Sequence, residues 1–99
     1  MPDDIFDNNR CIKDDLKKIR REINRKSKRF DLPLEAELES LLDNYSRKVS
    51  SSDKFQSDEM DVKVIRRMRE SIDDARNLDS LSVELRLLRG FIAAKLSDS

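Results

Sequence analysis

The side chains that most often carry out catalysis are scarce in this sequence. It contains no histidine, a single cysteine and a single glycine. These counts exclude a histidine general base, a cysteine–histidine nucleophile and a cysteine-rich zinc site. One glycine is also too few for a phosphate-binding glycine loop or a dinucleotide-binding motif. We therefore predict a protein that is not an enzyme, with no catalytic residues and no cofactor.

Carboxylates are the remaining groups that could bind a metal ion or transfer a proton. They lie close together at three places, Asp14-Asp15, Asp58-Glu59-Asp61 and Asp73-Asp74. Adjacent residues on a helix point about 100° apart, so a doublet cannot hold one ion between its two carboxylates. Acids at a helix start also stabilise the helix dipole. We predict solvated or capping roles and no metal site. A helical enzyme using arginine and lysine on an anionic substrate is the most distant alternative.

A basic segment, KKIRREINRKSKR at residues 17–29, has eight lysines and arginines against one glutamate. Four of them share one arc of a helical wheel, opposite the apolar positions: Lys17, Arg21, Arg25 and Lys28. Like charges at this spacing destabilise a helix by about 0.2–0.5 kcal/mol per pair, and an anionic partner would remove that cost. Nucleic-acid phosphates, an acidic protein surface and lipid headgroups are the candidate partners, beside a purely solvated face.

The C-terminal segment, up to about Leu96, is apolar on two sides. Its main stripe is Leu81, Leu85, Leu88, Ile92 and Leu96, and its second stripe is Val83, Leu87, Gly90, Phe91 and Ala94. Such a helix is either covered from two sides or exposes an apolar face to a partner. A glycine inside a helix costs about 1 kcal/mol relative to alanine, so close approach of another backbone would explain Gly90. Burial within the chain and a partner-binding face, including that of a homodimer, both fit this pattern.

Apolar residues at helical spacing predict four helices. The first covers about residues 4–29 and the second about 33–49, and the interruption at 31–33 makes them an antiparallel hairpin. The third is expected to begin at an N-cap Ser57, and the fourth at Asp79 or Ser80. In the hairpin, Asp15 should lie level with Arg47, and Arg25 with Glu37.

Residues 1–99 are therefore expected to form one domain, an all-α, antiparallel four-helix bundle with a long first helix. The sequence favours a non-catalytic protein–protein interaction module, such as an adaptor, assembly subunit or small regulator, that binds a protein partner or a second copy through apolar helix faces. The alternative is a nucleic-acid-associated protein that binds phosphates through the basic segment.

The expected location is intracellular, either cytoplasmic or nuclear. The lone cysteine fits a reducing compartment, and the start MPDDIFDNN has no signal-peptide pattern. No apolar run approaches the roughly 20 residues that span a bilayer, and the net charge is zero. A membrane is accordingly the least favoured partner.

Overall fold

The computed structural model describes residues 8–51 and 57–98, and this part of the chain forms four helices and no strand. The helices are α1 (Asn8–Arg29), α2 (Ala36–Ser51), α3 (Glu59–Asp74) and α4 (Leu78–Asp98). The predicted all-α bundle is confirmed, and its first helix is long, at 22 residues. The predicted start of that helix before residue 8 lies outside the described residues, as does most of the loop predicted after residue 49.

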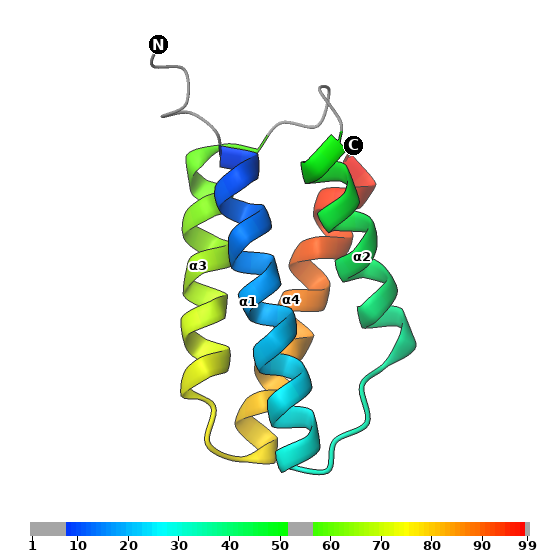
Figure 1. Cartoon of the computed structure of the whole chain (residues 1–99), viewed down its shortest axis with the longest axis vertical. Coiled ribbons are helices and arrows are strands. Elements are labelled where there is room, and N and C mark those ends of the chain that lie inside the picture. The colour runs from blue at the N-terminus through cyan, green and yellow to red at the C-terminus, as the bar shows by residue number, and fades with distance from the viewer. Residues whose placement is uncertain (1–7, 52–56, 99) are drawn as a thin grey trace.

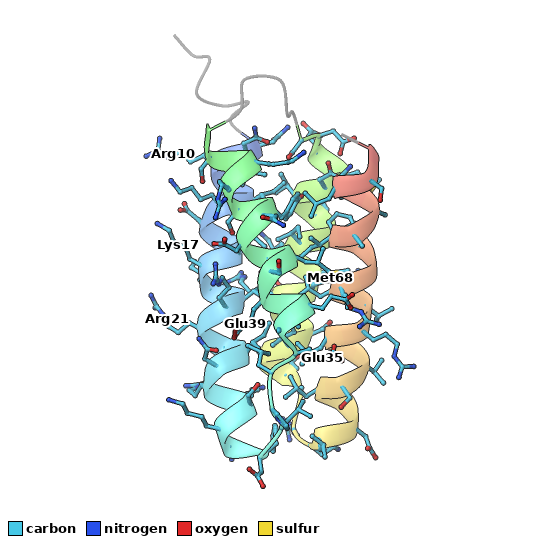
Figure 2. All side chains as sticks on the ribbon, turned by 90° about the vertical axis from the view of Figure 1, so that its right-hand side faces the viewer. Arg10, Lys17, Arg21, Glu35, Glu39 and Met68 are labelled. Atoms are coloured by element: carbon cyan, nitrogen blue, oxygen red, sulfur yellow. The ribbon has the colours of Figure 1, made fainter. Side chains whose placement is uncertain are left out.

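Successive helices run in opposite directions, so α1 and α3 run one way and α2 and α4 the other (Figure 1). The helix α1 packs against α2 and α3, and α4 packs against the same two helices. The helices α1 and α4 are therefore diagonal, on opposite sides of the bundle, as Figure 2 shows. This arrangement turns the outward faces of α1 and α4 away from each other.

The core lies along the bundle axis and uses the apolar stripes read from the sequence. The helix α1 contributes four residues with no exposed surface, Ile12, Leu16, Ile19 and Ile23. The helix α4 contributes the main stripe, of which Leu81, Leu88 and Ile92 are fully buried. Each such side chain stabilises the fold by about 1.5–3 kcal/mol relative to an exposed one. The two helices that position the candidate surfaces are thus each anchored by one inward face.

The end of α1 is closed by a hydrogen-bond pattern that turns the chain toward α2. The Leu32 N–H donates to the Ser27 carbonyl at 2.8 Å, and Asp31 has a positive φ of 56°. This is a Schellman motif, in which the residue at the left-handed position is usually glycine. Aspartate is among the few other residues that adopt this conformation at low cost. Pro33 then follows, where a helix could not have continued.

The caps of the last two helices differ from those expected. Asp58, not Ser57, caps α3: its side chain accepts from the Asp61 N–H at 2.9 Å, and the Asp61 carboxylate accepts from the Asp58 N–H. Asn77, not Asp79 or Ser80, caps α4, because its Oδ1 accepts from the Ser80 N–H at 2.8 Å. In both cases the cap is the residue whose side chain reaches an N–H three residues on.

The backbone of Ser57 is instead bound by the first turn of α1. The Asn9 Oδ1 accepts from the Ser57 N–H at 3.1 Å, and the Asn8 side chain donates to the Ser57 carbonyl at 3.0 Å. These two bonds connect the start of α1 to the residue before the cap of α3. Asn9, three residues before the buried Ile12 and so on the same side of α1, thus has a polar partner at a position where an apolar residue would be expected.

An ion pair does connect α1 and α2, between Arg20 and Asp43 at 3.9 Å, but the two pairings named from the sequence are replaced by others. Asp15 is buried and pairs with Arg69 of α3 at 3.3 Å. Glu37 of α2 pairs with Arg89 of α4 at 2.9 Å. The reason is that α1 and α2 each have a second neighbour, and those neighbours supply the opposite charges. The burial of Asp15 also corrects the solvated role that the sequence predicted for its carboxylate.

Candidate functional site

The outward side of α4 carries a row of exposed apolar and small residues. We define the α4 face as Val83, Leu87, Gly90 and Ala94. Val83 is 55% exposed and Leu87 is 54% exposed, and both small residues are also exposed. Steps of four, three and four residues keep all four within an arc of about 60° on the helix. The structure thus leaves four of the five residues predicted for partner binding open to solvent.

Phe91, the fifth residue of that predicted set, does not belong to the α4 face. It is partly buried and packs against the core, with its ring edge-to-face on Tyr45 at a centroid distance of 6.5 Å. On the helix it is one residue beyond Gly90 and therefore turned by about 100° toward the neighbouring helices. Because Phe91 is partly covered by its own chain, we leave it outside the α4 face, and its predicted part in partner binding stays a prediction.

Gly90 has no evident reason for being glycine within its own chain. A Cβ built at this position would meet no atom of the described residues within 4 Å, and its φ is not positive. Neither a close contact nor an unusual backbone conformation therefore requires the absence of a side chain. Because glycine costs about 1 kcal/mol relative to alanine inside a helix, the position is unfavourable in the isolated chain.

A groove of about 330 Å³ adjoins the α4 face. Its apolar wall comes from Leu32, Pro33, Leu38 and Leu85, and its polar side includes Glu35, Arg86 and Arg89. Arg86 follows Val83 by three residues and so is its neighbour on the helix surface. Arg86 therefore lies between the groove and the α4 face, whose own four residues do not line the groove.

The basic face predicted on α1 is also exposed. All four of its residues, Lys17, Arg21, Arg25 and Lys28, are open to solvent. Figure 2 shows Lys17 and Arg21 projecting from the α1 side, away from α4. Arg25 pairs with Glu22 at 2.7 Å, whereas no ion pair found among residues 8–51 and 57–98 involves Lys17, Arg21 or Lys28. One of the four charges is thus already compensated.

Lys26, which lies in the same basic segment, has a different role. It is buried, and its Nζ donates to three backbone carbonyl oxygens at the end of α3, those of Ile72 (2.7 Å), Asp73 and Ala75 (2.7 Å). A cation is favourable there because the last carbonyls of a helix carry partial negative charge. Its spacing of three residues from Ile23 was a signal for this inward position.

Buried polar groups at the opposite end of the bundle form a second internal cluster. Lys95 of α4 pairs with the buried Asp61 of α3 at 2.9 Å. Burial, together with the charge of Asp61, raises the pKa of Tyr45 well above its ordinary value. Burial in this cluster thus favours the uncharged phenol. Asp61, expected to be a capping residue, both completes the cap of α3 and connects α3 to α4.

Comparisons of this chain with protein-family models, with curated proteins and with solved structures find no match. Within the part of the chain that the structure describes, no helix combines the length and apolarity needed to cross a bilayer. The same part contains no group of three or more cysteine, aspartate or glutamate residues arranged to hold a metal ion. Function must therefore be inferred from the surfaces of the chain itself.

Proposed function

We propose that this protein is a non-catalytic protein-interaction module that binds its partner through the α4 face. The observation that carries the proposal is the exposure of Val83 and Leu87 on a helix whose other side fills the core. We also propose an intracellular location, cytoplasmic or nuclear, which the single cysteine supports.

The energetic support comes from the row that the four residues of the α4 face form together, and not from any one of them. Single exposed aliphatic residues are common on protein surfaces. Here two of them continue into Gly90 and Ala94, so the row runs along three turns of helix without a charge. Full burial of a valine or leucine is worth about 1.5–3 kcal/mol, so covering these half-exposed side chains would yield about 1 kcal/mol each.

The shape of the α4 face favours a helical partner. Helix axes approach to about 8–10 Å, and the small residues at the contact set the lower end of that range. Gly90 and Ala94 leave the backbone of α4 accessible, while Val83 and Leu87 provide side chains to insert between those of a partner. An amphipathic helix laid along α4 would use both features.

The test is capture of partners by the tagged full-length chain from an extract of its source cells, with and without nuclease. We expect proteins to be captured in both conditions by the wild type and to be lost with Leu87→Asp. The matched control is Met60→Asp, since Met60 is 64% exposed but lies on α3. Circular dichroism should show unchanged helicity for both variants. Capture that survives Leu87→Asp would contradict the proposal.

A second candidate function is binding of nucleic-acid phosphates through α1, favoured by the exposed Lys17, Arg21 and Lys28. Among residues 8–51 and 57–98, no ion pair involves these three side chains. Its test is binding of duplex DNA and of RNA by the wild type and by the double variant Lys17→Glu, Arg21→Glu. Phosphate binding predicts affinity that falls steeply with salt, with a slope of about −0.9 per phosphate contacted on DNA. Equal binding by the variant, or no salt dependence, would remove this candidate.

A further inference from the structure

We propose that the α4 face binds the α4 face of a second copy of this chain, with the two helices antiparallel about a two-fold axis between Leu88 and Arg89. The inference rests on the proposed function, because it names the partner of the same surface. It depends on the order of residue sizes along the α4 face, on the position of that pattern within the helix, and on Gly90.

The order of sizes is self-complementary in one orientation only. The first half of the α4 face carries the branched residues Val83 and Leu87, and the second half carries Gly90 and Ala94. In an antiparallel pair about the stated axis, Val83 lies level with Ala94 of the second copy, and Leu87 lies level with its Gly90. Each large side chain then faces a small one. A parallel pair would set Leu87 against Leu87 and leave a gap at the glycines.

The axis implied by this pairing falls at the centre of the helix. The helix α4 extends from Leu78 to Asp98, so its middle residue is Leu88. Two copies related by the axis would therefore overlap over residues 79–98, which is all of α4 but its first residue. The N-terminus of each helix would lie beside the C-terminus of the other, which places opposite ends of the two dipoles together. A two-fold pair of this kind uses the same patch twice and closes on itself.

The proposed pair explains why position 90 is a glycine, which the single chain does not. A Cβ at Gly90 would meet no atom within 4 Å in the described part of its own chain. In the antiparallel pair the Leu87 side chain of the second copy occupies that space. A larger residue at position 90 would hold the two backbones apart, because interaxial distance depends on the side chains at the contact.

The contact between the two α4 faces is small, and this limits the affinity of the dimer. The α4 face extends over 11 residue steps, or about 17 Å of helix. Its area is well below the roughly 800 Å² per partner of a standard stable interface. We therefore expect a weak dimer that forms as the protein concentration is raised.

Disulfide crosslinking tests the orientation. Cys11 is the only cysteine and is exposed, so Cys11→Ser provides a cysteine-free background. In that background, Val83→Cys protein mixed with Ala94→Cys protein should form the mixed disulfide under mild oxidation. Either protein alone should form little, since position 83 lies about 17 Å along the axis from position 83 of the second copy. Met60→Cys is the control for random collision. Self-crosslinking of Val83→Cys that matches the mixed reaction would overturn the proposal, as would mixed crosslinking no faster than the control.

Gly90→Leu tests the close approach. This change raises helix propensity and adds exposed apolar surface. If the two copies associated only through non-specific apolar contact, the variant would therefore dimerise more tightly. The proposed packing instead predicts at least about a tenfold weaker dimer by sedimentation equilibrium, equivalent to about 1.4 kcal/mol. Equal or tighter association would overturn the inference.

The outcomes also separate this inference from the proposed function. If the wild type is monomeric at every concentration, while Leu87→Asp still abolishes capture of another protein, the second copy is overturned as partner and the proposed function stands. If Leu87→Asp affects neither dimerisation nor capture, both fail.

Discussion

The outward faces of α1 and α4 lie on opposite sides of the bundle, and they differ in what their exposure implies (Figure 2). On α1 the exposed row is charged, and water solvates lysine and arginine there at little cost. On α4 the exposed row is Val83, Leu87, Gly90 and Ala94, which water solvates poorly. A basic row is therefore compatible with having no partner. An apolar row along a helix is a stronger indication of one.

The difference between the exposed faces of α1 and α4 arises from the composition of the two helices. The helix α1 has ten basic and three acidic residues, with its aliphatic residues confined to the inward side. The helix α4 has leucines on both sides, as the adjacent pair Leu87 and Leu88 illustrates, the first 54% exposed and the second fully buried. A helix that only had to fill the core would not need the outward leucine.

The largest expected effect separates the two sides of α4. Leu88→Ala should destabilise the fold by about 2–5 kcal/mol, because it leaves a cavity in a packed core. Leu87→Ala should change the free energy of unfolding of the monomer by no more than about 0.5 kcal/mol. Urea unfolding of both variants, at a concentration where the wild type is monomeric, measures the contrast. Similar losses would show that Leu87 is part of the core and not of a binding face.

A smaller contrast separates two lysines of α1. Lys26→Ala should cost about 1.5–3 kcal/mol, because it removes a charged donor from three carbonyl oxygens at the end of α3, two in buried hydrogen bonds and one in a partly buried hydrogen bond. Lys28→Ala, two residues further along, should change stability by less than about 0.5 kcal/mol since the side chain is exposed. Thermal unfolding of the two variants is the measurement. Equal effects would mean that Lys26 is not a structural member of the basic segment.

The smallest effect concerns Gly90. In the monomer, Gly90→Ala should stabilise the fold by about 0.5–1 kcal/mol, because alanine is the better helix former and its Cβ meets no neighbour among the described residues. Chemical unfolding at low protein concentration tests this. A loss of stability would indicate a constraint on Gly90 within the chain, and the case for a partner at this position would weaken.

Much of the fold could be predicted from the spacing of apolar residues. Ile12, Leu16, Ile19 and Ile23 occupy the core as their helical periodicity indicates, and so does the main stripe of α4. What periodicity does not contain is the order of helices around the bundle. The contact of α1 with α3 was therefore not foreseen, nor were the partners of Asp15 and Lys26 that α3 supplies.

The candidate site could be predicted in part for the same reason. The second apolar stripe of α4 could be recognised in the sequence, but the sequence did not show which of its residues the neighbouring helices would cover. Phe91 lies within the stripe and yet packs on Tyr45, because α4 has neighbours on two sides and only the remaining arc is open. The expected cap of α3 was likewise one residue too early: Ser57 instead donates its backbone N–H to Asn9, which is distant in sequence.

Site-specific photo-crosslinking in cell extract tests the central claim most directly, since it probes both outward faces in one experiment. A photoreactive residue would replace Val83 on the α4 face in one protein and Arg21 on α1 in another. We predict protein adducts from position 83, either with a second copy or with another protein, that persist after nuclease treatment and are absent from position 21. Adducts confined to position 21, or attached to nucleic acid, would contradict the account and assign binding to α1.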